Sequence, residues 1–381
     1  MPACLWFSFL GIQRDHSRIV SHPGLCPHQG DTHEGGFLML TIKQIAKLCN
    51  VSTGTVSRVI NERPGVSTET IKRVKGVIRR YKYRPSVVAR SLATKRSNSI
   101  GVLLADITNP FYAELVEVIE REARKAQYVT IFFSTYSDQR LQKRGIDFLR
   151  ANRVDGILFA SVLLHDPDVE RLAGEGFPFV LVNRRLEDDM ADYVVEDNVL
   201  GGYKATEHLY KLGHRRIGII NGPISLSTGL ERLEGYRRAL RDNGLAVDRE
   251  LIKVGDFRRG SGYEAMLKFL GMAKRPSAIF ATNDYMAMGA FEAILDRGLR
   301  VPEDIALVGY DDFEWASFGR IRLTTIRGDK SEMGRQGIRL LIRKINQVGS
   351  ERETPPSHIL LEPQLIIRDT CGYRRKTSGS P

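Results

Sequence analysis

The stretch from Thr41 to Thr94 limits the possible fold most strongly, because helix-start signals recur in it at very short spacing. The run Thr41-Ile-Lys-Gln44 is typical of a capping box, in which the first and fourth residues satisfy each other's backbone amides. A turn follows, and Ser52 can cap a second helix that we expect to end near Ile60. Two short helices joined by so few residues predict a helix-turn-helix.

A third helix completes this small unit in our interpretation. Ser67 caps it, and a buried stripe is expected to contain Ile71, Val74, Ile78 and Tyr81. The second helix would place its early residues at base edges in the major groove. Its outward face carries Thr53, Gly54, Thr55, Ser57 and Arg58. Arg58 either holds a guanine with two parallel hydrogen bonds or contacts only phosphate, as most basic side chains do.

The charge distribution supports a polyanionic partner independently. Between Leu40 and Asn98 there are 14 Lys and Arg against 2 Asp and Glu, a net charge of +12. The whole chain also carries +12, so its remaining residues balance to zero. A cationic excess confined to the segment with helix-turn-helix spacing indicates nucleic-acid binding.

Two runs in this segment resemble the LacI–GalR family of bacterial transcription regulators, namely Val51-Ser-Thr-Gly-Thr-Val-Ser-Arg-Val-Ile-Asn61 and Tyr83-Arg-Pro-Ser-Val-Val-Ala-Arg-Ser-Leu92. The resemblance extends over residues 41–369 and implies a hinge helix that forms on the operator. It also implies that Leu92 wedges into the minor groove, where an apolar side chain can kink the duplex. The DNA-contacting positions that it implies are Thr41, Ser52, Thr53, Gly54, Thr55, Ser57, Arg58, Asn61, Tyr83, Ala89 and Leu92.

The two ends of the chain carry no sustained period. Residues 1–39 have neither the basic start nor the longer apolar core of a signal peptide, so we expect a disordered leader and no metal site. Residues 370–381 are expected to be a disordered basic tail in which Cys371 is an incidental thiol. Four widely spaced cysteines indicate a reducing compartment. No apolar run reaches the roughly 20 residues that span a bilayer.

From Ser99 onward, continuous apolar strands alternate with amphipathic helices, which predicts parallel sheets covered on both faces. The series restarts near Asn198, so we expect two lobes with a cleft between them, like the periplasmic sugar-binding proteins that the family resembles. The expected organisation is a helix-turn-helix head over 40–84, a hinge helix and linker over 85–98, and a two-lobed effector and dimerisation domain over 99–369. The first lobe would contain about 99–197 and 327–354, and the second about 198–326 and 355–369.

Polar and aromatic residues follow the expected strand ends, where ligands of open α/β sheets bind. Amides, carboxylates and arginines can pair with sugar hydroxyls while aromatic rings lie against C–H faces. Any single such residue is more often a cap, a turn residue or a structural ion pair. By the resemblance, the effector-contacting positions are Asn109, Phe111, Tyr112, Arg184, Asp197, Arg232, Phe257, Asn283 and Asp311.

Two departures bear on ligand identity. Asn183 stands where ribose binders carry an aspartate, and Leu226 stands where the purine-responsive member carries an arginine. Both count against those ligands. We therefore expect a neutral sugar or sugar derivative, and Arg184 and Arg232 leave a sugar phosphate open.

The sequence thus predicts a cytoplasmic, sugar-responsive repressor that binds a pseudo-palindromic operator as a homodimer, without cofactor or membrane contact. One alternative is an extracytoplasmic sugar-binding protein, which the reading head and the missing signal peptide disfavour. The other is a nucleotide-dependent enzyme, but neither a Gly-x-Gly-x-x-Gly run after the first strand nor a Gly-Lys-Ser/Thr phosphate loop is present. His214 is expected to be a residue of a helix-end turn rather than an acid–base group.

Overall fold

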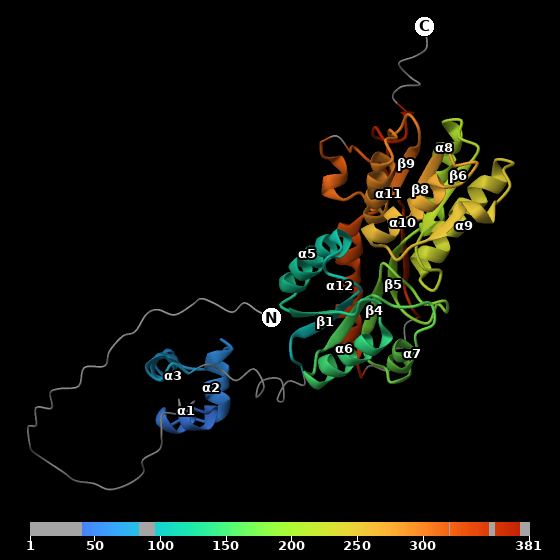
Figure 1. Cartoon of the computed structure of the whole chain (residues 1–381). Coiled ribbons are helices and arrows are strands. Elements are labelled where there is room, and N and C mark those ends of the chain that lie inside the picture. Colours follow the sequence, from blue (N-terminus) through green and yellow to red (C-terminus); the bar gives the residue numbers. More distant parts are fainter. Residues whose placement is uncertain (1–39, 84–95, 320, 350–354, 374–381) are drawn as a thin grey trace, which may run out of the picture. The chain divides into compact units, whose positions relative to one another are not determined.

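The computed structural model describes residues 40–83, 96–319, 321–349 and 355–373, which belong to two separate units (Figure 1). The first unit contains the described residues up to Tyr83, and the second begins at Arg96. The expected leader, Ala89 and Leu92 of the hinge, and residues 374–381 lie outside the described residues. None of the described helices combines the length and apolar character needed to cross a membrane.

The first unit consists of α1 (Ile42–Leu48), α2 (Thr53–Ile60) and α3 (Thr68–Arg80). The capping box is present: the Thr41 amide donates to Gln44 Oε1 at 2.7 Å, and the Gln44 amide donates to Thr41 Oγ1 at 3.4 Å. Ser52 and Ser67 cap the next two helices as expected. Ile45, Val56 and Val74 are fully buried, and they hold the three helices around one small core.

One core prediction for this unit is wrong. Tyr81 was expected in the buried stripe of the third helix, but its side chain is 47 % exposed. The helix ends at Arg80, so Tyr81 occupies the C-cap and its side chain leaves the stripe. Tyr83 packs partly against the core instead.

The second unit contains two six-stranded sheets, each in its own lobe. The first sheet has the order β11-β5-β4-β3-β1-β2, and all its pairs are parallel. Its strands are β1 (Ser99–Leu104), β2 (Val129–Ser134), β3 (Gly156–Ala160), β4 (Phe179–Val182), β5 (Tyr193–Glu196) and β11 (His358–Leu361). Its helices are α5 (Pro110–Lys125) and α12 (Lys330–Gln347) on one face, and α6 (Gln139–Ala151) and α7 (Pro167–Gly174) on the other.

The second sheet has the order β12-β10-β9-β8-β6-β7, and only β12 pairs in the antiparallel sense. Its strands are β6 (Ile217–Asn221), β7 (Ile252–Val254), β8 (Ala278–Ala281), β9 (Ala306–Tyr310), β10 (Thr324–Arg327) and β12 (Gln364–Ile366). Its helices are α8 (Asn198–Lys211) and α9 (Ser227–Asp242) on one face, and α10 (Arg259–Leu270) and α11 (Asp284–Asp296) on the other. Short 3₁₀ turns lie at Arg249–Leu251 and Glu314–Ser317. This two-lobed α/β architecture confirms the predicted fold class.

Two predicted boundaries are wrong. Residues 355–369 were assigned to the second lobe as one segment, but β11 pairs with β5 in the first sheet and only β12 joins the second. Pro363 lies between the two strands and has no amide hydrogen for a ladder, so the apolar run divides there. The tail was expected to begin at residue 370, yet Thr370 and Cys371 are buried, and the Leu307 amide donates to the Thr370 carbonyl at 2.8 Å.

Candidate functional site

The outward face of α2 divides into side chains that project freely and side chains used in local caps. Thr53, Gly54 and Arg58 are exposed, and Arg58 makes no side-chain hydrogen bond or ion pair with another described residue. Ser52 Oγ lies 3.0 Å from Thr55 Oγ1, so both hydroxyls are engaged at the helix start.

At the other end of α2, Asn61 Nδ2 donates to the Ser57 carbonyl at 2.9 Å. Thr41 serves its own capping box, and burial raises the pKa of the Tyr83 hydroxyl. The cations of the first unit are mostly exposed, and the pair Lys75–Glu62 at 3.1 Å is the one ion pair among its described residues. The face is therefore suited to contact a polyanion.

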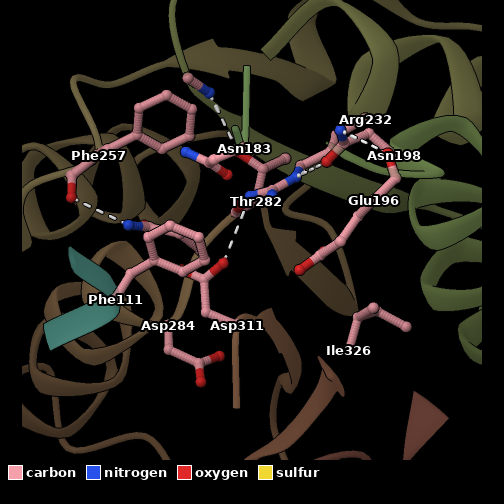
Figure 2. Close-up of polar contacts among 12 residues, drawn as sticks. Phe111, Asn183, Glu196, Asn198, Arg232, Phe257, Thr282, Asp284, Asp311 and Ile326 are labelled. Carbon is pink, nitrogen blue, oxygen red and sulfur yellow. Dashed lines mark hydrogen bonds and ion pairs between the residues drawn. The ribbon is translucent and has the colours of Figure 1, made fainter. Parts of the chain in front are cut away.

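In the second unit, a cavity of about 350 Å³ lies between the two lobes. This volume is at the lower end of the ~300–1,000 Å³ range of small-molecule sites, which suits a monosaccharide-sized ligand. The predicted effector residues that line it are Asn109, Phe111, Tyr112, Arg184, Arg232, Phe257, Asn283 and Asp311. Figure 2 shows the rings of Phe111 and Phe257, from α5 of one lobe and the loop after β7 of the other, with Asn183, Arg232 and Asp311 around the same space.

Unusual backbone angles at strand ends present several of these side chains. Asn183 after β4 and Phe257 after β7 both have φ of 66°, and Asp311 after β9 has φ of 111°. Non-glycine residues adopt these angles at a cost of order 1–3 kcal/mol and are often found at ligand sites. The strand ends thus turn their side chains into the cleft rather than along the strand.

Arg232 is fully engaged at the floor of the cavity. Its Nε donates to Asn198 Oδ1 at 2.8 Å and its Nη1 donates to the Thr282 carbonyl at 2.6 Å. Nη1 also lies 3.7 Å from Asp311 Oδ1, and the guanidinium carbon lies 3.5 Å from the centre of the Tyr310 ring. These contacts fix the guanidinium in one orientation.

Several buried acids gather at this floor. Burial raises the pKa of Asp311 well above its usual range, although Arg232 acts against the rise. Burial also raises the pKa of Glu196, which lies behind Arg232. Burial raises the pKa of Asp284 to about 7.

Asp197 does not line the cavity. Its carboxylate accepts the Leu200 amide at 2.9 Å and caps α8, so the structure gives it a local role in place of the predicted contact. Its neighbour Asn198 supports the site instead, because its Oδ1 accepts a hydrogen bond from Arg232 Nε.

Sequence reasoning missed other lining residues. Ser137 follows the end of β2, and Thr228 lies in the first turn of α9, after β6. Asp106 and Arg258 form an ion pair of 3.3 Å at the rim, one from each lobe. That contact depends on how the lobes approach each other, which no local pattern encodes.

Comparisons with known proteins agree with these two units. Residues 41–86 match the family model described as bacterial regulatory proteins, lacI family. Residues 97–366 match periplasmic binding proteins and sugar binding domain of LacI family.

Similar proteins include the ribose operon repressor of Escherichia coli strain K12, which is 39 % identical over 87 % of this chain and all of the relative. The transcriptional repressor PurR of Pasteurella multocida strain Pm70 is 36 % identical over 88 % of this chain and all of that relative. A solved lac repressor dimer bound to operator and the anti-inducer ONPF matches with a TM-score of 0.76 and 29 % identity, covering 87 % of this chain and 99 % of the other. A transcriptional regulator CelR–cellobiose complex matches with a TM-score of 0.67 and 33 % identity over the same shares. The three-helix head, the two-lobed domain and these matches establish that the chain belongs to the lacI family of bacterial regulatory proteins.

Proposed function

We propose that this protein is a transcriptional repressor that reads operator DNA with α2 and responds to a sugar-type ligand bound between the lobes of its second unit. The observation that carries the proposal is the pairing of an exposed, cationic helix-turn-helix face with a cavity lined by aromatic rings and polar groups from both lobes. The similar proteins support it, because they are named as repressors.

The protein acts as a homodimer on a pseudo-palindromic operator. A two-fold protein places two recognition helices on two half-sites about one helical turn apart. The lac repressor structure that this chain matches is a dimer bound to operator, which supports the same arrangement here. Binding to chromosomal DNA places the protein in the cytoplasm, and the free thiols of Cys49 and Cys371 suit that reducing compartment.

Contacts that join the lobes around the cavity link ligand binding to the arrangement of the two lobes. The Leu164 amide donates to the Ser225 carbonyl at 3.0 Å, and Arg185 Nε donates to Glu231 at 2.8 Å. A ligand held by both lobes favours the arrangement in which these contacts form. It changes operator affinity only as far as its own affinity differs between the two arrangements, typically by 1–3 kcal/mol.

The ligand is not a purine base in this proposal. Leu226 is buried at the cavity wall, and its side chain offers no hydrogen bond to a purine edge. The ribose binders' aspartate is replaced by Asn183, so ribose itself is also disfavoured.

The test selects operator sequences from a random duplex library and then measures affinity at several salt concentrations. We expect a palindromic consensus and a linear fall of log affinity with log salt, at about 0.9 per phosphate contacted. Arg58→Ala should cost roughly 1–3 kcal/mol and relax preference at one operator position per half-site. The control Arg259→Ala, at an exposed arginine paired with Glu292 in the second unit, should leave operator affinity unchanged.

Two results would count against parts of this proposal. Equal weakening by Arg58→Ala on every sequence would make Arg58 a phosphate contact. A protein with no salt-sensitive affinity for any duplex would remove the DNA-binding function altogether.

A further inference from the structure

Most of the charged groups that line the cleft are balanced by a neighbour. Arg232 forms an ion pair with Asp311, and Arg258 forms one with Asp106 at the rim. Asp256 is exposed, and its carboxylate accepts the Arg258 amide at 2.9 Å. Arg184 is the exception among the described lining residues, and it lies deeper than the rim pair.

Arg184 is a buried cation with few partners. The residue is 4 % exposed, and its one side-chain hydrogen bond to a described residue is a long one of 3.4 Å from Nη1 to Ser137 Oγ. Its Nε has no acceptor, and no carboxylate of the described residues forms an ion pair with it. Buried hydrogen-bonding groups are normally satisfied, and a buried charge normally has a counter-charge.

The residue that precedes Arg184 in the chain carries an amide instead of an acid. Asn183 precedes it at the end of β4 and also lines the cavity, where its Nδ2 donates toward the Tyr112 hydroxyl at 3.5 Å. The amide fills the place of a carboxylate without supplying its charge. Arg184 therefore keeps its positive charge for a group that enters the cleft.

A second feature of the same wall attracts negative charge. The helix α9 runs from Ser227 to Asp242, and it begins without a side-chain cap because Leu226 occupies its N-cap position. Leu226 and Thr228 line the cavity, and the Arg185 amide donates to Ser227 Oγ at 3.1 Å, so the first turn of α9 adjoins the segment that carries Arg184. Uncapped amides and the helix dipole at such an end favour anions.

We infer that the ligand of this cleft carries an anionic oxygen group, a carboxylate or a phosphate, that binds Arg184 beside the first turn of α9. The inference rests on the proposed function and narrows its ligand to an acidic sugar derivative, either a sugar acid or a sugar phosphate. A planar guanidinium can donate two parallel hydrogen bonds to either group, which a neutral hydroxyl cannot accept in the same way. Neither ribose nor a purine base supplies this charge.

Calorimetric titrations of the full-length protein without DNA test the inference with matched ligand pairs. One arm compares D-glucuronate with D-glucose and with methyl D-glucuronate, and the same comparison is made with the galactose series. The other arm compares D-ribose 5-phosphate with D-ribose, and D-glucose 6-phosphate with D-glucose. We expect one anionic compound to bind at least tenfold more tightly than its neutral counterpart, with one site per chain, and the arm that succeeds identifies carboxylate or phosphate.

Three variants test whether the preference for the anionic ligand over its neutral counterpart depends on Arg184. Arg184→Gln should abolish it, so that the charged and neutral members of the pair bind within about threefold of each other. Asn183→Asp should reverse it, because the new carboxylate neutralises Arg184 and repels an anionic ligand. Arg171→Gln is the control at an arginine of α7 in the same lobe, which is paired with Asp168 and does not line the cavity, and it should leave the ratio of charged to neutral ligand affinity unchanged.

A further measurement does not depend on choosing the right sugar. In chloride buffer, Arg184→Gln should raise the unfolding temperature of the ligand-free protein, since it removes a buried charge without a partner. Inorganic phosphate at constant ionic strength should stabilise the wild type more than Arg184→Gln, while any effect on the basic head is common to both.

The inference is overturned if neutral sugars bind as tightly as their acidic counterparts. It is also overturned if phosphate stabilises the two proteins equally and no acidic ligand shows a preference that depends on Arg184. Loss of operator binding with a retained anion preference would instead overturn only the proposed repressor function.

Discussion

Asn109, Asp197 and Asn283 all accept a backbone amide at the start of a helix, yet their positions relative to the cleft differ. Asn109 and Asn283 also line the cavity, whereas Asp197 does not. Asn283 has a third role, because its Nδ2 donates to the Phe257 carbonyl at 3.0 Å and so supports the Phe257 ring. At the scale of single residues, capping and ligand contact are therefore separable functions of the same side-chain types.

A pair of alanine substitutions separates these roles. Asp197→Ala and Asn283→Ala should each lower the free energy of unfolding by about 1 kcal/mol, because each removes an N-cap acceptor. Only Asn283→Ala should weaken the binding of the ligand that the titrations identify, by tenfold or more. Urea unfolding measures the change in stability, and calorimetry measures the change in ligand affinity. An equal loss of ligand affinity in both variants would show that Asp197 also contributes to ligand binding.

Residue types at strand ends, together with the family resemblance, predicted most of the residues that line the cavity. The rule failed at Asp197 because the sequence cannot tell a carboxylate that turns back to its own helix from one that points across a cleft. It passed over Ser137, whose serine type is common in turns, although Ser137 stands beside Arg184. Both errors concern side-chain direction, which depends on backbone angles that only the folded chain fixes.

At the scale of elements, glycines allow the helices on each face of the second sheet to touch backbone to backbone. A Cβ at Gly235 of α9 would lie 2.1 Å from the Val199 carbonyl oxygen of α8. A Cβ at Gly262 of α10 would lie 2.1 Å from the Met286 carbonyl oxygen of α11. Such contacts with backbone cannot be relieved by moving a flexible side chain, so these positions set the spacing of both helix pairs.

Two glycines of one helix provide a matched test of this packing. Gly262→Ala should destabilise the second unit by about 1–3 kcal/mol, because the added methyl forces α10 away from α11. Gly260→Ala lies two residues earlier in α10, where no described residue outside the adjoining turns of the helix comes within 4 Å of the new Cβ, and it should be neutral or stabilising by up to about 1 kcal/mol. Thermal unfolding of the second unit measures both, and similar effects of the two substitutions would show that the close contact does not limit the packing.

Elements were predictable where the hydrophobic period was long, as in the alternating strands and helices after Ser99. The sequence pattern did not predict α7, a short helix of eight residues, or β10, a strand of four. It also fused β11 with β12, since both flanks of Pro363 are apolar and the local pattern is the same whichever sheet each flank joins. Sheet membership is a long-range property that periodicity does not report.

At the scale of the whole molecule, the two units differ in how they hold charge. The head carries most of the cationic surplus, while the second unit buries acids where the strands of its second sheet end. Asp284 is fully buried, and its carboxyl group accepts hydrogen bonds from Thr325 Oγ1 at 2.6 Å and from the Phe313 amide at 3.0 Å. Burial raises its pKa to about 7, and the nearby Asp312 adds to the rise while Lys330 opposes it.

This buried acid makes the stability of the second unit depend on pH. Between its ordinary pKa of 3.8 and its folded pKa of about 7, folded Asp284 keeps a proton that the unfolded chain has released. Its contribution to stability is therefore fully present at acid pH, falls as the pH rises through this window, and is constant above it. The fall approaches about 1.4 kcal/mol per pH unit in the middle of the window and flattens near the folded pKa, so it amounts to roughly 2 kcal/mol between pH 5 and pH 7.

Asp284→Asn, which carries no proton to lose, tests this dependence. The free energy of unfolding of the wild type minus that of the variant should fall by roughly 2 kcal/mol from pH 5 to pH 7 and stay level from there to pH 8, as measured by urea unfolding of the second unit. Asp304→Asn is the control, because hydrogen bonding to Arg300 lowers the pKa of the partly exposed Asp304 and moves its titration below this window. A wild-type-minus-variant difference for Asp284→Asn that stays flat from pH 5 to pH 8 would mean that folded Asp284 is ionised throughout, stabilised by Lys330 and its two hydrogen-bond donors.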